Sequence, residues 1–254
     1  MKKVVKSVIN SLGYQITKVS PPPTPVENWP FDCTEADVRI LRAILGFTMT
    51  GVSNQLQLIQ AVRYIVRARI PGCFVECGVW RGGSSMAIAM ALEQEGELNR
   101  DIYLFDTFEG MPPPGEKDNR FDGAAADTLL SQDPQKQGVF WAVAGLQEVQ
   151  ANVFSSGYPK DQLHFTKGPV EETLLDDPSK GAVALLRLDT DWYESTKCEM
   201  EHFFARVAPG GIVIFDDFGY WQGARRAVEE YLAAAGEEYF LLRIDETARL
   251  LIKR

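Results

Sequence analysis

The sequence predicts an α/β protein with a doubly wound, mostly parallel sheet of seven strands. Two apolar runs of strand length, Val183–Asp189 and Gly211–Asp216, end abruptly in aspartates, and helical patterns follow both. Such runs are typical of parallel strands that are buried on both faces. From Cys73 onward, strand and helix patterns alternate along the chain, as in sheets with helices on both faces.

The predicted strands are short apolar segments, mostly separated by helical patterns. They cover Cys73–Val79, Ile102–Asp106, Leu163–Lys167, Val183–Asp189, Gly211–Asp216, Tyr239–Ile244 and Ala248–Ile252. The helices predicted between them are Ser84–Glu95, Gln147–Phe154, Ser195–Val207 and Ala224–Ala235. Three residues separate the last two strands, too few for a parallel crossover, so an antiparallel hairpin is expected there. One strand near the sheet edge should therefore run opposite to the rest.

An α-helical segment is predicted ahead of the sheet. Residues 32–46 form one predicted helix with Thr34 as its N-cap. Ser53–Arg69 is predicted as a second helix, capped by Ser53 and ended before Pro71. We therefore divide the chain into a helical lead-in and linker over 1–70 and a principal domain over 71–254.

The first residues predict a short amphipathic helix, whose apolar face runs from Val4 to Leu12. A stiff proline-rich linker over 21–25 follows it. We expect this helix to pack against the body or against a second subunit in a homo-oligomer. Docking to a membrane surface is the alternative.

The stretch Phe108–Gly138 lacks a clear strand or long helix. It contains a run of prolines over 112–114 and a charged patch over 116–120. A connection this long inside a compact domain is usually functional or disordered. We expect a lid-like insertion at about 108–140, with a solvated insertion as the alternative.

Composition excludes several classes of protein. The net charge of −9 argues against a nucleic-acid surface, which needs a basic face. No stretch is long and apolar enough to span a bilayer. The cysteines lack the spacing of a zinc site and imply no disulfide, which fits a reducing cytoplasm. We expect a cytoplasmic protein whose partner is a small molecule.

Aspartates cluster at the expected carboxyl ends of two strands. Asp189 and Asp191 follow one apolar run, and Asp216 and Asp217 follow the next. Ligands of open α/β sheets bind at this edge. Two like charges about 4 Å apart repel by about 4 kcal/mol at an effective dielectric near 20, so a cation or a shared proton is needed. We expect a divalent metal. Asp191 could instead point away as a helix cap or an ion-pair partner.

The first strand leads into a glycine-rich turn, Gly78-Val79-Trp80-Arg81-Gly82-Gly83. A dinucleotide fingerprint, G-x-G-x-x-G, that starts at Gly78 would need glycine at position 80, where the pyrophosphate approaches the backbone closely. This chain has Trp80 at that position. A nucleotide without phosphates fits better, which makes a nicotinamide dehydrogenase the weaker alternative. Asp106 ends the second strand, where an acidic side chain can accept hydrogen bonds from both ribose hydroxyls.

Four motifs together resemble the macrocin O-methyltransferase family. They are E-C-G-V-W-R-G-G from Glu76, F-D-T-F-E-G-M-P from Phe105, L-D-T-D-W-Y-E-S-T from Leu188 and F-D-D-F-G from Phe215. The resemblance covers roughly residues 48–231. It implies a class I methyltransferase fold, Rossmann-like, that binds S-adenosylmethionine and magnesium and methylates sugar hydroxyls during natural-product assembly.

The resemblance also implies roles for individual residues. The metal ligands would be Asp189, Asp216 and Asp217, with Asp189 also the general base. The cofactor-binding residues would be Met49, Thr50, Glu76, Gly78, Val79, Trp80, Asp106, Thr107 and Phe108.

The expected chemistry is methyl transfer to an oxygen. An alcohol is a poor nucleophile at neutral pH, so a metal that lowers its pKa and a carboxylate that takes its proton are both useful. Oxygen ligands favour Mg²⁺, with Mn²⁺ or Ca²⁺ as alternatives. Tyr220 and Trp221 are placed to stack on the acceptor, whereas Trp192 and Tyr193 could line its pocket or pack in the core. The acceptor alternatives are a sugar, or a catechol or phenol. A non-catalytic cofactor-binding partner subunit is the alternative outside the enzymes.

Overall fold

The computed structural model describes residues 29–133, 135–136 and 139–254. The chain comprises two units, Met1–Asp32 and Cys33–Arg254, and the second contains the sheet. The helix predicted between Val4 and Leu12 and the proline-rich linker lie outside the described residues. No helix in the described part of the chain has the length and apolar character needed to cross a membrane.

A seven-stranded sheet forms the centre of the second unit, in the order β3-β2-β1-β4-β5-β7-β6. Neighbouring strands from β3 to β5 are parallel, whereas β7 is antiparallel to both β5 and β6. The predicted doubly wound sheet with one reversed strand near its edge is confirmed. The strands are β1 (Cys73–Cys77), β2 (Ile102–Asp106), β3 (Leu163–Lys167), β4 (Val183–Leu188), β5 (Val207–Phe215), β6 (Leu242–Arg243) and β7 (Arg249–Ile252).

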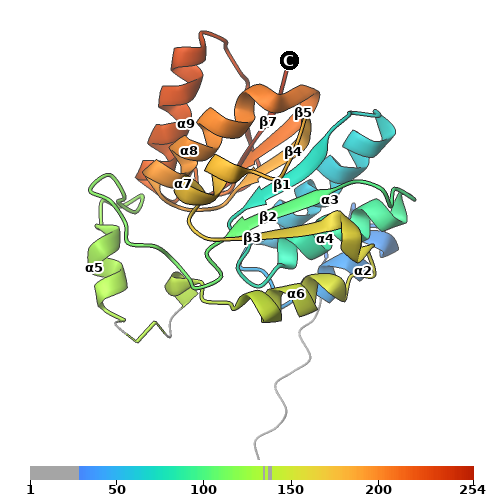
Figure 1. Ribbon diagram of the computed structural model, residues 1–254, viewed down its shortest axis with the longest axis horizontal. Coiled ribbons are helices and arrows are strands. Elements are labelled where there is room, and N and C mark those ends of the chain that lie inside the picture. The colour runs from blue at the N-terminus through green and yellow to red at the C-terminus, as the bar shows by residue number, and fades with distance from the viewer. Residues whose placement is uncertain (1–28, 134, 137–138) are drawn as a thin grey trace, which may run out of the picture. The chain divides into compact units, whose positions relative to one another are not determined.

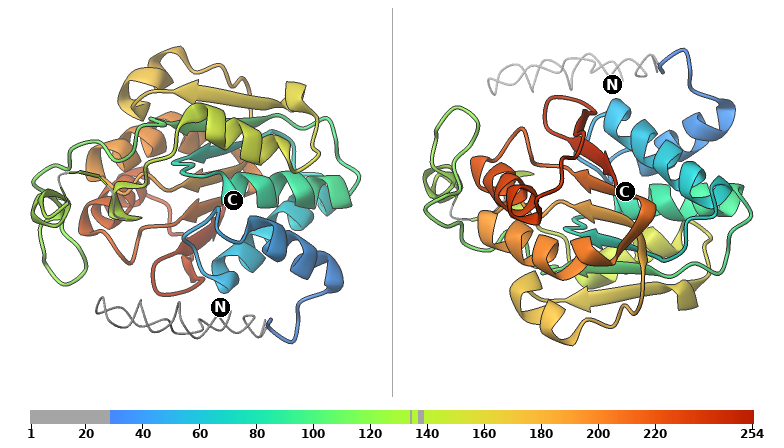
Figure 2. Two further views of the ribbon diagram at one scale, coloured as in Figure 1. Left: turned by 90° about the horizontal axis from the view of Figure 1, so that it is seen from below. Right: turned by 90° about the horizontal axis from the view of Figure 1, so that it is seen from above.

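Helices cover both faces of the sheet (Figure 1 and Figure 2). One face carries α2 (Glu35–Ile44), α3 (Val52–Arg67), α4 (Gly83–Gln94) and α6 (Leu146–Phe154). The other carries α7 (Val170–Thr173), α8 (Tyr193–Phe203) and α9 (Gln222–Ala235). The insertion holds a further short helix, α5 (Ala126–Ser131), which the sequence pattern did not predict.

Burial explains why the sequences of the three central strands, β1, β4 and β5, are almost continuously apolar. Every residue of β1 and β4 is buried, and the core includes Val75, Leu186 and Val213 packed with α8. The pairing aligns Cys77 with Leu188 and Leu188 with Phe215. The residues that follow these strand ends are therefore neighbours, which assembles the site.

Local sequence explains several element boundaries. Thr34 caps α2 through a reciprocal capping box with Asp37, as predicted. The N-cap of α3 is Gly51 rather than the predicted Ser53, and glycine has no side chain with which to cap the helix. β1 ends at Cys77 instead of Val79 because Gly78 turns the backbone with φ +84°. β5 begins at Val207, earlier than predicted, because helix α8 already ends at Phe203.

Candidate active site

A cavity of about 620 Å³ opens at the carboxyl ends of the parallel strands. Its size lies within the range of small-molecule sites. Residues that follow β1, β2, β4 and β5 line it, together with the segment 47–51 before α3, the insertion, and the β6–β7 turn. It therefore lies where ligands of open α/β sheets bind.

The glycine turn after β1 brings its backbone close to the end of β4. A Cβ on Gly78 would lie 1.9 Å from the carbonyl oxygen of Asp189, so glycine is the residue that fits there. Trp80 adopts a left-handed conformation at φ +46°, which is uncommon for a residue with a side chain. Gly78, Val79 and Trp80 all line the cavity.

Asp106 holds the glycine turn against the end of β2. One carboxylate oxygen accepts hydrogen bonds from the backbone N–H of Val79 at 2.6 Å and of Trp80 at 3.1 Å. The other oxygen accepts from the N–H of Phe108 at 2.6 Å. Asp106 and Thr107 line the cavity, whereas Phe108 is buried beside it.

The segment before α3 closes one side of the cavity. The N–H of Gly83 donates to the carbonyl oxygen of Phe47 at 2.8 Å. The side-chain amide of Gln55 donates to Thr48 at 3.2 Å and also to Thr50. Thr50 and the exposed side chain of Met49 line the cavity, as do Gly78 and Asp106 across from them.

Carboxylates gather on the opposite side. Asp189, Asp216 and Asp217 each offer one oxygen, and these three oxygens lie within 4.8 Å of one another. Burial raises the pKa of Asp189 and of Asp217 well above the usual range, and neighbouring carboxylates raise it further. Oδ2 of Asp217 is buried without a hydrogen-bond partner among the described residues.

A fourth carboxylate, Asp191, lies beside them. It has a left-handed backbone at φ +70°, lines the cavity, and accepts a hydrogen bond from the indole N–H of Trp221 at 2.5 Å. Burial, with Asp189 nearby, raises the pKa of Asp191 to about 8. Within residues 29–133, 135–136 and 139–254, its side chain caps no helix and pairs with no cation, and because it lines the cavity, the alternative that it points away from the site is wrong.

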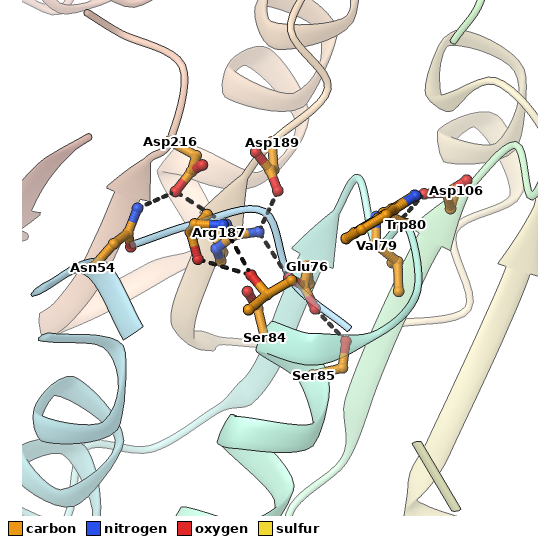
Figure 3. A network of polar contacts seen from close by, with 12 residues as sticks. Asn54, Glu76, Val79, Trp80, Ser84, Ser85, Asp106, Arg187, Asp189 and Asp216 are labelled. Atoms are coloured by element: carbon orange, nitrogen blue, oxygen red, sulfur yellow. Dashed lines mark hydrogen bonds and ion pairs between the residues drawn. The ribbon is translucent and has the colours of Figure 1, made fainter. Parts of the chain in front are cut away.

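Arg187 lies beneath the carboxylates and was not among the predicted site residues (Figure 3). Its Nη1 donates to Asp189 at 2.6 Å and to Glu76 at 2.8 Å, and its Nη2 lies 3.0 Å from Oδ1 of Asp216. Asn54 of α3 donates to the same Asp216 oxygen at 2.6 Å. The signal in the sequence is an arginine inside an apolar strand, L-L-R-L-D.

Glu76 does not line the cavity, in contrast to its expected contact with the cofactor. Its side chain is 1% exposed, accepts a hydrogen bond from Ser85, and pairs with Arg187. Glu76 is the fourth of the five residues of β1, and its side chain meets Ser85 in the first turn of α4, whereas Gly78, Val79 and Trp80 in the turn after the strand line the cavity. Glu76 therefore contacts the site indirectly, through its ion pair with Arg187.

The insertion packs on the first turns of α8 and α9. Asp118 is buried and accepts hydrogen bonds from the N–H of Tyr193 at 2.8 Å and of Gly115 at 2.7 Å. Trp192 and Trp221 meet edge to face in a small apolar cluster with α5. Tyr220 and Trp221 line the cavity, whereas Trp192 and Tyr193 are core residues outside it.

A Rossmann-like sheet with this strand order, a glycine turn after β1 and an acidic end of β2 defines the class I methyltransferase fold. Comparisons with known proteins are consistent with that class. The family described as Macrocin-O-methyltransferase (TylF) matches residues 19–253. The chain belongs to this family and is an O-methyltransferase.

Individual relatives of the chain are also O-methyltransferases. A tetracenomycin relative from Streptomyces olivaceus, 8-demethyl-8-(2,3-dimethoxy-alpha-L-rhamnosyl)-tetracenomycin-C 4'-O-methyltransferase, is 33% identical over 248 residues, covering 96% of this chain and 88% of its own length. Mycinamicin III 3''-O-methyltransferase from Micromonospora griseorubida is 30% identical over 79% of this chain and 76% of its own. The solved structure of the O-methyltransferase NovP superposes with a TM-score of 0.71 at 30% identity, covering 82% of each chain.

Proposed function

We propose that the protein transfers the methyl group of S-adenosylmethionine to a hydroxyl of a sugar within a glycosylated natural product, with Mg²⁺ at Asp189, Asp216 and Asp217. The observation that carries this proposal is that the three carboxylates open into the same cavity as the glycine turn and Asp106. The rhamnosyl 4'-O-methylation in the name of the tetracenomycin relative supports a sugar acceptor.

The cofactor half of the cavity suits an adenosyl group without phosphates. Gly78, Val79 and Trp80 would hold the methionine and ribose part, and Asp106 with Thr107 would hold the adenosine, with Phe108 packed behind them. Met49 and Thr50 would cover the cofactor from the segment before α3. S-adenosylmethionine, when bound, supplies an electrophilic methyl group on a sulfonium.

The donor set at the other half fits a hard divalent cation. Its ligands are all carboxylate oxygens, which Mg²⁺ prefers and which Mn²⁺ and Ca²⁺ also accept. The unpartnered, buried Oδ2 of Asp217 is the kind of oxygen that a cation would satisfy. A divalent cation held there would polarise the acceptor hydroxyl and lower its pKa.

The chain supplies the remaining chemistry. Oδ2 of Asp189 is engaged with Arg187, which leaves Oδ1 to accept the hydroxyl proton as general base. Tyr220 and Trp221 offer aromatic surface to the acceptor. Met111 and Pro112 of the insertion line the cavity and would help to exclude water from the reacting atoms when both substrates are bound.

A methyl-transfer assay with a panel of glycosides and catechols tests the proposal. We expect turnover on glycosides, lost on chelation and restored by Mg²⁺, and reduced about 10²–10⁴-fold in Asp189→Ala, because a positioned general base typically contributes that much. Asp161→Asn is the matched control, since Asp161 is exposed and does not line the cavity.

Each part of the proposal can fail separately. Full activity in excess chelator would contradict the metal, and a preference for catechols would replace the sugar with a phenolic acceptor. Calorimetric binding of S-adenosylmethionine without turnover on either class would favour a non-catalytic partner subunit. Binding of NAD in its place would reject the cofactor.

Two further expectations belong with this function. The described residues form no disulfide, and Cys73 and Cys77 are buried thiols, which supports a cytoplasmic setting. Self-association through the helix predicted between Val4 and Leu12 stays a prediction. Size-exclusion chromatography with light scattering on the full chain and on a chain without that segment tests it.

A further inference from the structure

A buried ion pair joins the two central strands under the cavity. Glu76 of β1 and Arg187 of β4 are register partners, and both side chains are 1% exposed. Burying such a pair costs free energy that the mutual attraction often fails to recover, and apolar residues of similar volume commonly stabilise a fold as well or better. Stability of the sheet is therefore a poor explanation for this pair.

The geometry around Arg187 indicates what it does instead. Its guanidinium contacts one oxygen of Asp189 and one of Asp216, the residues that directly follow β4 and β5 (Figure 3). Asn54 donates to the same Asp216 oxygen from the α3 side. Each aspartate thus has one oxygen fixed and one left for the cavity, where Asp217 joins them.

Charge leads to the same conclusion. Glu76, Asp189, Asp191, Asp216 and Asp217 lie together, and among the described residues Arg187 is the cation in contact with them. One guanidinium offsets the repulsion that would otherwise drive Asp189 and Asp216 apart, but leaves an excess of negative charge for a divalent ion. The planar fork can reach two carboxylates at once, which an ammonium group cannot do with the same rigidity.

We propose that Arg187 is a positioning residue: it holds Asp189 and Asp216 in the arrangement that binds the divalent cation, and Glu76 with Ser85 fixes Arg187 in place. This inference rests on the proposed metal-dependent function and adds to it the part of the chain that prepares the ligands. It also gives Glu76 a role that does not require contact with the cofactor.

Titration calorimetry with Mn²⁺ and Mg²⁺ tests the proposal on Arg187→Lys, which keeps the charge and loses the fork. We expect the cation affinity to fall about 10–100-fold, as is typical when a residue that orients metal ligands is altered. Affinity for S-adenosylhomocysteine should change less than about threefold, because the guanidinium of Arg187 bonds Glu76, Asp189 and Asp216, whereas the glycine turn is held by Asp106. In the methyl-transfer assay, the Mg²⁺ concentration for half-maximal rate should rise in parallel.

Arg206→Lys is the matched control. Arg206 pairs with the buried Asp177 at 2.6 Å, away from the cavity, so this variant should lose stability without losing cation affinity. Glu76→Gln is a second variant in case Arg187→Lys folds poorly. It keeps a hydrogen-bond acceptor for Arg187 and should weaken cation binding to a smaller extent.

The outcomes separate the two proposals. If wild-type protein binds neither cation, the metal in the proposed function fails. If wild-type protein binds and Arg187→Lys binds equally well, the positioning role is wrong and the metal stands. A parallel loss of cation affinity, cofactor affinity and thermal stability in Arg187→Lys would also overturn the positioning role, because a purely structural residue behaves in that way.

Discussion

Backbone conformations that side chains rarely adopt concentrate at the cavity. Trp80, Phe108 and Asp191 have φ values of +46°, +52° and +70°, and they follow the ends of β1, β2 and β4 respectively. Such conformations cost about 1–3 kcal/mol each and persist where the surroundings impose them. Here the hydrogen bonds of Asp106 and of Trp221 hold them. The strain therefore lies where the cofactor and acceptor are proposed to meet.

A pair of glycines tests how closely the turn after β1 approaches β4. Gly78 and Gly96 both have a left-handed backbone, but a Cβ on Gly78 would collide with Asp189, whereas Gly96 has open space. Gly96→Ala should cost about 1–2 kcal/mol, the penalty of the conformation alone. Gly78→Ala should cost clearly more and also weaken cofactor binding.

Urea unfolding of both variants and calorimetry with S-adenosylhomocysteine measure these effects. Equal destabilisation by the two substitutions would show that the backbone around Gly78 can accommodate a Cβ beside the Asp189 carbonyl, which contradicts the expected collision.

Some site residues were predictable from the sequence and others were not. Asp189, Asp216 and Asp217 follow two apolar strands that are consecutive in the chain, and parallel strands end at a common edge, so their proximity could be predicted by assuming that consecutive strands are neighbours. Arg187 required knowledge that β1 and β4 are neighbours and that Glu76 is its register partner. Local sequence does not encode that pairing, and an isolated arginine in a strand gives no partner.

The insertion after β2 is bonded to the helices that follow the two strands ending in aspartates, β4 and β5. Asp118 accepts the first N–H of α8, where no side chain of the preceding residues caps the helix. A Cβ on Gly223, in the first turn of α9, would lie 2.0 Å from Oδ1 of the same carboxylate. These contacts lead us to expect that residues 110–131 of the insertion act as a wall of the cavity. Asp118, the residue that joins the insertion to α8, is one that local sequence patterns could not connect to that helix.

Asp118→Ala should release this wall. Loss of the capping bond and of the buried acceptor should cost about 1–2 kcal/mol and speed cleavage of the insertion in limited proteolysis. Asp118→Asn keeps an acceptor oxygen and should remain close to wild type. Asp122→Ala is the matched control, because Asp122 is an exposed residue of the same insertion whose carboxylate bonds Arg120 and the N–H of Ala124, both within the insertion.

Unchanged cleavage in Asp118→Ala would mean that the apolar cluster around Trp192 and Trp221 is sufficient to hold the insertion. In that case the wall would depend on side-chain packing rather than on the capping bond.

The net charge of the protein and its stability are linked. The chain carries a net charge of −9, and the acidic cluster places several of these charges at one edge of the sheet. A ligand that binds only the folded state adds to the free energy of unfolding by mass action. A bound divalent cation would relieve the repulsion and stabilise the fold as a whole.

Thermal unfolding with and without Mg²⁺ measures this effect. At about 100 times the dissociation constant, the stabilisation should be about 2.7 kcal/mol, which raises the midpoint by roughly 5–10 °C in a chain of this size. KCl at the same ionic strength controls for general screening. Asp217→Asn should show a smaller rise, and an equal rise in KCl would remove the evidence for a specific site.

The contact between Glu76 and Arg187 joins residues 111 positions apart, and that between Asn54 and Asp216 joins residues 162 positions apart. On the ribosome, Glu76 emerges long before Arg187, so the nascent chain carries an acidic side chain in β1 before the neighbouring strand β4 has been made. Such distant pairings make folding slow, because the entropy of closing a long loop is lost before the contact can stabilise the fold. Translation must therefore pass Arg187 before the centre of the sheet can close, and a nascent chain stalled earlier would leave Glu76 without its counter-charge.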